Sequence, residues 1–342
     1  MPHRIVQADN LEILPTLEDA SFDLIYIDPP FNTGREQRHT RVAVRRDDEA
    51  ARVGFGGRRY RTVKLGSLAF ADCFDDFLAF LELRLVHAHR LLKRHGSFFL
   101  HIDPRESHYC KVLLDAIFGR ACFMNEIVWS YDFGGRPKNR WPCKHDVILW
   151  YVKDPHRYTF NYDAIDRIPY MAPGLVGAEK AERGKTPTDV WWQTIVPTSG
   201  HERTGYPTQK PLRILERIVL VHSNPGDRVL DFFAGSGTLG EAAARHGREF
   251  LLVDRNPDAI AVMRQRLAFA QPELVGVPVE EEPRQDAPAA PPTEPNDAAA
   301  PLTGAPAAAS DNAPGDAPPP HPPTYGGSAP PEMQPSPAAT EG

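Results

Sequence analysis

Short apolar runs alternate with stretches of helical spacing along residues 3–270. The runs are bounded by turn and breaker residues and predict strands, and apolar positions three and four residues apart predict helices between them. Strands are expected at residues 3–8, 21–28, 97–103, 123–131, 145–152, 228–231 and 250–254, and helices at 11–17, 75–94, 106–118, 212–219, 238–245 and 257–269. This alternation is typical of an α/β fold.

Three segments depart from this alternation. Residues 35–64 contain ten basic residues, four acidic residues and three glycines, which predicts a mobile basic loop that contacts phosphates or is simply solvated. Residues 154–207 lose periodicity and are a candidate partner-reading insertion. Residues 272–342 are rich in proline, alanine and acids, so we expect them to be disordered.

The net charge of −6 is unevenly distributed along the chain. Residues 280–342 hold ten acidic residues and one basic residue, which leaves 35 acidic and 38 basic residues in residues 1–279. The body of the chain is therefore mildly basic, and its tail is acidic. This balance permits a nucleic-acid partner without requiring one.

The cysteines and the apolar runs indicate the cellular compartment. No Cys-x-x-Cys pair and no ligand spacing with histidines is formed by Cys73, Cys110, Cys122 and Cys143. Neither a disulfide framework nor a structural zinc site is expected. No apolar run approaches the length of a membrane span, and the N-terminus lacks a signal-peptide pattern. These features predict a reduced, cytoplasmic protein without a membrane partner.

The first group of candidate functional residues lies at the end of the apolar run at residues 21–28. Asp28, Pro29, Pro30 and Phe31 come at its end. The prolines hold the chain extended, so we expect Asp28 and Phe31 at the carboxyl edge of the sheet, where open α/β folds bind ligands. Acceptor oxygens beside a flat aromatic face suit a planar ring that carries an exocyclic amine. The alternative is an ordinary strand and proline turn with Asp28 as a helix cap.

A second group of candidate residues lies at 229–238, where the sequence predicts a strand, a glycine turn and the start of a helix. Glycines allow close approach of the backbone, and a helix start offers free amide donors. Asp254 ends the following strand nineteen residues after Gly235, which suits hydrogen bonds to ribose hydroxyls. The turn lacks the third glycine of a nicotinamide fingerprint and the Gly-Lys-Ser/Thr of a P-loop. S-adenosylmethionine, a nucleoside with a zwitterionic amino-acid tail, fits better.

Two shorter segments complete the candidates. In the sequence Tyr-Pro-Thr-Gln-Lys-Pro at 206–211, Thr208 is expected to cap the next helix and Pro211 to lie in its first turn. Residues 134–141 combine glycines, bases and Trp141 in a hairpin-like connection. That connection is either a nucleic-acid contact or a plain loop.

Asp-Pro-Pro-Phe at 28–31 and Phe-Ala-Gly-Ser-Gly-Thr at 233–238 together resemble the amino-methylating DNA methyltransferases, which modify adenine N6 or cytosine N4. The catalytic motif precedes the cofactor loop, and Thr-Gln-Lys-Pro comes just before that loop. This order matches the circularly permuted β group of the family. The resemblance covers about residues 3–270. It implies a Rossmann-like, doubly wound, mostly parallel seven-stranded sheet that is circularly permuted, with a disordered C-terminal tail.

The resemblance also assigns regions and residues. Residues 1–153 would form the catalytic part, 154–207 the variable target-recognition region, 208–271 the cofactor-binding part and 272–342 the tail. The implied catalytic residues are Asp28, Pro29, Pro30 and Phe31. The implied cofactor-binding residues are Asp9, Thr208, Lys210, Asp231, Phe232, Ala234, Gly235, Ser236, Gly237, Thr238 and Asp254. Phe31 replaces a tyrosine that is often found in the motif, which keeps stacking and loses a hydroxyl.

The implied reaction is methyl transfer from S-adenosylmethionine to N6 of an adenine flipped out of double-stranded DNA, without a metal. Cytosine N4 is the alternative, although the family's cytosine enzymes usually carry serine where Asp28 stands. The candidates for DNA contact are Arg58, Arg59, Arg136, Lys138 and Arg140.

Other interpretations remain beside this one. Enzymes that methylate RNA or a protein glutamine amide usually carry asparagine in place of Asp28 and place the cofactor loop first, and this chain differs in both respects. A non-catalytic DNA-binding relative is a further alternative, against which the intact Asp28 and glycine turn argue. The resemblance also implies a homodimer and a cognate restriction enzyme as further partners to test.

Overall fold

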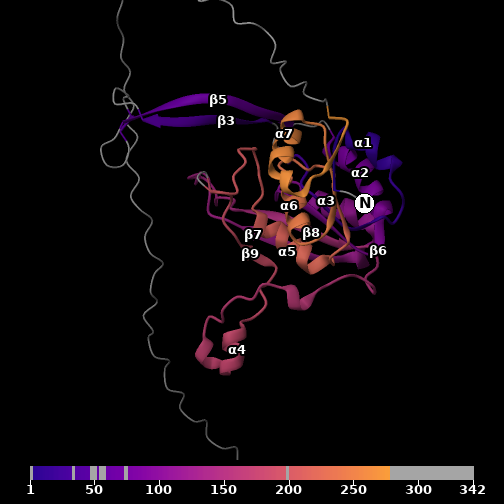
Figure 1. Cartoon of the computed structure of the whole chain (residues 1–342). Coiled ribbons are helices and arrows are strands. Elements are labelled where there is room, and N and C mark those ends of the chain that lie inside the picture. The colour runs from indigo at the N-terminus through magenta and orange to yellow at the C-terminus, as the bar shows by residue number, and fades with distance from the viewer. Residues whose placement is uncertain are drawn as a thin grey trace, which may run out of the picture. The chain divides into compact units, whose positions relative to one another are not determined.

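A mixed nine-stranded sheet is the central element of the computed structural model (Figure 1). From one edge to the other its strands are β12 (Glu273–Val275), β1 (Arg4–Gln7), β11 (Glu249–Asp254), β10 (Arg228–Asp231), β2 (Phe22–Ile27), β6 (Leu92–Ile102), β8 (His145–Val152), β7 (Phe123–Ser130) and β9 (Val190–Trp192). Neighbouring strands are parallel except where β8 meets β6 and β7. The expected mostly parallel α/β sheet is confirmed, and its seven strands are extended by the three-residue edge strands β12 and β9.

The structure describes residues 3–32, 35–46, 52–53, 59–72, 76–197 and 200–277, with backbone pairing alone for the segments between 35 and 72. The chain divides into two units, Met1–Glu280 and Glu281–Gly342, and every described residue belongs to the first. Within these described residues, no helix combines the length and the apolar character that a membrane span needs.

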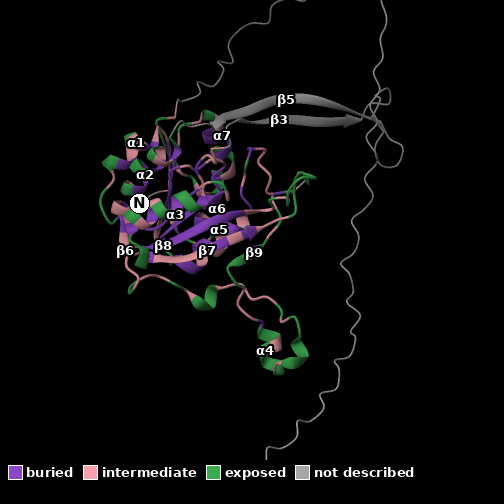
Figure 2. Cartoon of the chain, turned by 180° about the vertical axis from the view of Figure 1, so that it is seen from behind, coloured by how far each residue is buried: buried purple, intermediate pink, exposed green. Residues whose placement is uncertain are grey.

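Helices cover both faces of the sheet (Figures 1 and 2). The α-helices are α1 (Asn10–Ile13), α2 (Phe77–Leu91), α3 (Ser107–Phe118), α4 (Ala178–Arg183), α5 (Leu212–His222), α6 (Thr238–Arg245) and α7 (Pro257–Arg266). Short 3₁₀ turns are η1 (Leu14–Thr16), η3 (Arg120–Cys122), η4 (Tyr162–Ala164), η5 (Pro173–Leu175) and η6 (Ala268–Ala270).

The connections between parallel strands run in two directions from the middle of the sheet. β1–α1–β2 and β2–α2–β6 run one way, whereas β10–α6–β11 and β11–α7–β12 run the other way. Because such connections are right-handed, α1 and α2 lie on one face and α6 and α7 on the opposite face. The direction changes between β2 and β10, and this topological switch point is where open α/β sheets bind ligands.

The central strand, β2, is buried along its whole length. All six of its residues are buried, as expected for a parallel strand covered on both faces. The one charged residue in it, Asp23, is satisfied by hydrogen bonds from Lys93 Nζ at 2.8 Å, His95 Nε2 at 2.8 Å and the Arg228 amide at 2.9 Å. Burial alone would raise the pKa of Asp23, but these hydrogen bonds lower it below its ordinary value.

The described residues of the segment 35–64 lie in strands, so the prediction of a loop was wrong for them. β3 (Arg35–Arg46) pairs antiparallel with β5 (Arg59–Asp72), and β4 (Arg52–Val53) pairs with β5 in a separate three-stranded sheet. β3 carries several β-branched residues, which favour a strand. The three glycines that led to the loop prediction lie in the connection at 54–58, outside the described residues, as does Arg58.

Two smaller predictions were also wrong. β12 pairs with β1, so the ordered chain continues beyond residue 272, and the tail from residue 278 onward lies outside the described residues. A three-residue strand is too short for a hydrophobic pattern to reveal. Thr208 does not cap α5, because the N-cap is Pro211, and Glu202 Oε2 accepts the Leu212 amide at 3.0 Å.

Candidate active site

The carboxyl ends of β1, β2, β10 and β11 open into a cavity of about 560 Å³ at the switch point. All the residues implied in catalysis or cofactor binding line it, except Gly237. The set comes from segments as distant in the chain as Asp9 and Asp254, and parallel strands bring them to one edge. The structure therefore places these residues together, and their individual roles stay predictions.

Asp28, directly after β2, forms an ion pair with a lysine from the other end of the chain. Lys210 Nζ lies 2.5 Å from Asp28 Oδ2, and the two side chains are only 8% and 17% exposed. The other carboxylate oxygen, Oδ1, is buried without a hydrogen-bond partner among the described residues. A buried acceptor without a donor is costly, so Oδ1 can still accept a hydrogen bond from a ligand that reaches it.

Phe31 contributes an aromatic surface beside this carboxylate. Its ring is half-buried, lines the cavity and packs at 5.9 Å, centroid to centroid, against His101. Lys210 Nζ lies 4.8 Å from the ring centroid of Phe31. The lysine therefore contacts both the carboxylate and the ring, which fixes their relative positions.

A chain of buried polar side chains supports this wall of the cavity. Tyr26 hydroxyl lies 2.7 Å from His101 Nδ1, and His101 Nε2 lies 3.3 Å from Asp146 Oδ2. Tyr131 donates to the other oxygen of Asp146 at 3.0 Å. Burial raises the pKa of Tyr26 well above its ordinary value, which keeps that hydroxyl protonated. This series of polar contacts holds the His101 ring, on which Phe31 packs.

The glycine turn lies opposite, between β10 and α6. Gly235 and Gly237 have φ angles of +50° and +73°, in the left-handed region that favours glycine. A Cβ atom on Gly237 would come within 2.8 Å of Met263 Cγ, so this glycine is needed for packing against α7. This contact explains why Gly237 alone of the turn does not line the cavity.

Two carboxylates flank the turn. Asp254 accepts hydrogen bonds from the amides of Gly235 and Asn256, each at 2.8 Å, and burial raises its pKa. Asp231 accepts from the Phe233 amide at 2.9 Å, and its complete burial raises its pKa well above the ordinary value. Asp254 thus fixes the turn to the end of β11 and still keeps lone pairs for a ligand.

Sequence reasoning missed the residues that close the cavity near β1. Asn10 Nδ2 donates to the Phe232 carbonyl at 2.8 Å, and its Oδ1 accepts from Arg84 Nε at 2.7 Å. Arg84 Nη2 lies 3.6 Å from Asp9 Oδ1, which also caps α1. Asn10 directly follows Asp9 at a strand end, which was the available signal. Arg84 gave none, because it lies within an amphipathic helix.

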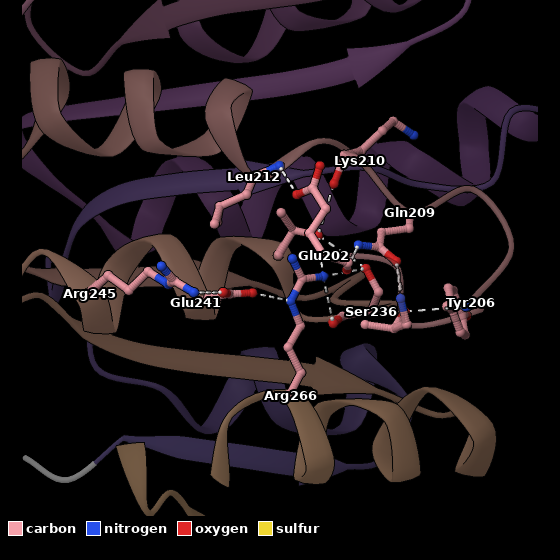
Figure 3. A network of polar contacts seen from close by, with 11 residues as sticks. Glu202, Tyr206, Gln209, Lys210, Leu212, Ser236, Glu241, Arg245 and Arg266 are labelled. Atoms are coloured by element: carbon pink, nitrogen blue, oxygen red, sulfur yellow. Dashed lines mark hydrogen bonds and ion pairs between the residues drawn. The ribbon is translucent and has the colours of Figure 1, made fainter. Parts of the chain in front are cut away.

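The segment before α5 is held by its own side chains (Figure 3). Gln209 Oε1 accepts from the Thr204 amide at 2.8 Å, and Gln209 Nε2 donates to the Glu202 carbonyl at 2.7 Å. Thr208, with a φ angle of +60°, lies at the bend that these hydrogen bonds close. This ordered bend brings Lys210 to Asp28.

Of the five DNA-contact candidates, Arg136, Lys138 and Arg140 are exposed on the connection between β7 and β8. Trp141 beside them is 94% exposed. Phe133, in the same connection, lines the cavity. The connection therefore has an aromatic side chain at the cavity and basic and aromatic side chains exposed beyond it. Arg59 opens β5, and its side chain is not among those described.

The protein is an open α/β sheet with a cavity at its topological switch point, and sequence comparison identifies the family. The protein-family model for N6/N4 methyltransferases, described as DNA methylase, matches residues 22–265. The type II methyltransferase M.HpaI of Haemophilus parainfluenzae is 31% identical over 267 residues, which cover 78% of this chain and 74% of the relative. The DNA adenine methyltransferase YhdJ of Escherichia coli K12 is 31% identical over 279 residues, which cover 78% and 83%. The chain belongs to this DNA methylase family.

Solved structures share the fold. The PvuII DNA methyltransferase, which is cytosine-N4-specific, aligns with a TM-score of 0.54 at 14% identity, over 79% of this chain and 93% of that one. TTHA0409 of Thermus thermophilus aligns with a TM-score of 0.50 at 21% identity, over 80% and 99%. The family and the fold expected from the two sequence motifs are thus confirmed.

Proposed function

We propose that this protein transfers a methyl group from S-adenosylmethionine to N6 of adenine in double-stranded DNA. The observation that carries the proposal is the state of Asp28: Lys210 occupies one carboxylate oxygen, and the other is buried and free to accept. Asp28 lines the same cavity as the glycine turn.

The cavity lining suits the parts of S-adenosylmethionine. Asp254 keeps acceptor capacity for ribose hydroxyls. Asp9 and Phe233 also line the cavity, and we assign them to the adenine of the cofactor. The start of α6 after the glycine turn suits the carboxylate of the amino-acid end, because a helix start offers free amide donors. When bound, this cofactor supplies a methyl group on a positively charged sulfur.

Asp28 addresses the main chemical difficulty of the reaction. The lone pair of an exocyclic amine is delocalised into the base, which makes the nitrogen a poor nucleophile. Hydrogen bonds from the amine to Asp28 Oδ1 and to the Pro29 carbonyl draw the nitrogen toward tetrahedral geometry and return the lone pair to it. Positioning of this kind supplies about 7–11 kcal/mol of the barrier. The nitrogen then gives up a proton, for which Asp28 Oδ1 is the nearest proposed acceptor.

A base inside a duplex cannot reach the cavity and must be flipped out, at a cost of roughly a few kcal/mol. Stacking on Phe31 offsets part of this cost. We assign backbone contacts to Arg58, Arg59, Arg136, Lys138 and Arg140. We also assign base stacking to Trp141, which is almost fully exposed beside three of them.

Adenine is favoured over cytosine on two grounds. Asp28 stands where the family's cytosine enzymes usually carry serine, and one relative at 31% identity is described as a DNA adenine methyltransferase. Cytosine N4 is the alternative, since a cytosine-N4-specific enzyme shares the fold. The homodimer, the cognate restriction enzyme and the cytoplasmic location stay predictions.

The test is Asp28→Ala, with Asp19→Ala as the matched control on the exposed surface. Asp28→Ala should bind S-adenosylmethionine within about threefold of the wild type by isothermal titration, yet transfer no methyl group to DNA. Asp19→Ala should do both normally. Normal turnover by Asp28→Ala would show that the proposed mechanism is wrong.

A further inference from the structure

Lys210 has hydrogen-bonding capacity that the mechanism above does not use. Its side chain is 8% exposed, the residue lines the cavity, and its Nζ lies 2.5 Å from Asp28 Oδ2. An ammonium group has three N–H donors, and this ion pair takes one of them. No other hydrogen bond of the Lys210 ammonium group occurs among the described residues. A buried donor without an acceptor is costly, so the remaining donors are available to a ligand.

The backbone around Lys210 fixes where this ammonium group can reach. Gln209 closes the preceding bend, and Thr238 Oγ1 donates to the Lys210 carbonyl at 3.3 Å. Figure 3 shows the Lys210 side chain extending away from Gln209. The side chain is thus anchored at its base and ends at Asp28 and at Phe31, whose ring centroid lies 4.8 Å from Nζ.

The ion pair therefore presents an acceptor beside a donor. Asp28 Oδ1 has no hydrogen-bond partner among the described residues, and the ammonium group at the neighbouring oxygen, Oδ2, retains N–H groups. The complementary pattern on a base is an exocyclic amine, which donates, next to a ring nitrogen, which accepts. Adenine carries this pattern at N6 and N1, and cytosine carries it at N4 and N3. Thymine and guanine carry the reverse on the same edge, a carbonyl oxygen beside a ring N–H.

Adenine has a second ring nitrogen near its amine, N7, and comparison with cytosine distinguishes the two. The family model that matches this chain is one of N6 and N4 methyltransferases, so one type of site receives either base. In cytosine the other neighbour of the amine is a C–H group. The ring nitrogen on the base-pairing edge, N1 in adenine and N3 in cytosine, is the acceptor that both bases share. This edge becomes accessible when the base is flipped out.

We propose that Lys210 is a specificity-determining residue that donates a hydrogen bond to N1 of the target adenine while Asp28 Oδ1 accepts one from the N6 amine. This inference rests on the proposed function, because that function supplies the base. Thymine or guanine would set Lys210 against an N–H group and Asp28 against a carbonyl oxygen. Both protein groups would then stay without partners, so the pair excludes these bases.

The competing interpretation is that Lys210 only orients the Asp28 carboxylate. A lysine that only orients the carboxylate would affect every target base equally. A lysine that reads the base affects only a base that has the ring nitrogen. The two interpretations therefore differ in their response to the loss of N1 from the target base.

The experiment measures single-turnover methylation of duplexes in which the target adenine is replaced by 1-deazaadenine or 7-deazaadenine. The first base lacks N1, the second lacks N7, and both keep the amine. The ratio of the 7-deazaadenine rate to the 1-deazaadenine rate should be at least about tenfold larger for the wild type than for Lys210→Met, the scale of one hydrogen bond to a charged group. Because the intrinsic reactivities of the two bases are the same for both proteins, the change in this ratio reports the lysine alone. Lys180→Met, on the exposed face of α4, is the matched control and should keep the wild-type ratio.

Two results would contradict this assignment in different ways. The same ratio in the wild type and Lys210→Met, with adenine itself methylated by the wild type, would overturn the inference and leave the proposed function standing. A wild-type protein that methylates no adenine in duplex DNA would contradict the proposed function and this inference with it.

If Lys210→Met does not fold, a binding measurement on the wild type tests the same point. Each analogue is placed opposite an abasic site, so that lost base pairing does not contribute to the affinity. Fluorescence anisotropy in the presence of S-adenosylhomocysteine should show the 7-deazaadenine duplex bound about tenfold or more tightly than the 1-deazaadenine duplex. Equal affinities would overturn the inference.

Discussion

Lys210 and Asp28 are 182 residues apart in the chain and 2.5 Å apart in the structure, between Nζ and Oδ2. Their ion pair fixes the Asp28 carboxylate and leaves Oδ1 as the oxygen without a hydrogen-bond partner among the described residues. It also joins the two halves of a permuted domain, since Asp28 follows β2 and Lys210 precedes α5. Substitution of the lysine tests what this pair does for catalysis.

Lys210→Met should lower kcat about 10²-fold or more, because it removes a preorganised charge from the reacting centre. The carboxylate of Asp28 is then no longer oriented by a cation. Binding of S-adenosylmethionine should change little, since the Thr238 hydroxyl contacts the Lys210 backbone, which the substitution keeps. Steady-state methylation kinetics measure the effect, with Lys180→Met on the exposed face of α4 as control. An unchanged kcat would show that catalysis does not need Lys210.

Phe31 is predicted to stack on the flipped base. Stacking on an aromatic side chain stabilises a base by about 1–3 kcal/mol, so Phe31→Leu should lower kcat/KM for DNA by roughly 5- to 150-fold. Phe31→Tyr keeps the ring and should stay within about threefold of the wild type. The affinity for S-adenosylmethionine serves as the internal control and should not change. Equal activities of the leucine and tyrosine variants would argue against stacking.

The raised pKa of Asp254 leads us to predict that cofactor binding depends on pH. Its carboxylate accepts the Gly235 amide and is assigned to the ribose, and both contacts are stronger with the ionised form. Burial raises the pKa of Asp254, so protonation begins at a higher pH than for an ordinary aspartate. The affinity for S-adenosylmethionine should therefore fall as the pH is lowered toward and through that raised pKa. Titration calorimetry across the acidic range measures this fall.

Asp254→Asn provides the comparison for that pH profile. It should bind about tenfold more weakly at neutral pH, because an amide group offers only one acceptor oxygen. Its profile should also lack the acid limb seen in the wild type. A variant with the same acid limb would assign the titration to another group.

The basic connection between β7 and β8 is predicted to contact phosphates. Replacing Arg136, Lys138 and Arg140 by alanine should weaken binding to all DNA sequences alike. The slope of log K against log salt concentration should become shallower by about 3, close to one for each phosphate that is no longer neutralised. Fluorescence anisotropy with labelled duplexes at several salt concentrations gives the slope. An unchanged slope would show that this connection does not touch the DNA backbone.

Much of the fold could be predicted because its signals are local. The runs that became β2, β8 and β10 are apolar and end at recognisable residues, so strand bounds matched closely. The glycine turn and the two acids that flank it also carry local signals. Residues 35–64 were mispredicted because glycines in a connection were taken as evidence against strands on either side of it.

The rest of the site depends on contacts between distant residues. No pattern in the sequence places Lys210 on Asp28, Arg84 on Asn10, or Arg266 behind the glycine turn. Each contact exists because parallel strands bring separate segments to one edge of the sheet. The sequence can name the residues that touch a ligand, whereas the folded chain reveals those that hold them.

The most direct test of adenine methylation uses S-adenosylmethionine with a tritiated methyl group. The protein is incubated with it and unmethylated duplex DNA, and the DNA is then digested to nucleosides and separated. We expect label in N6-methyladenosine and none with Asp28→Ala. Label in N4-methylcytosine would contradict the assignment to adenine, and DNA without label would contradict the proposed function as a whole.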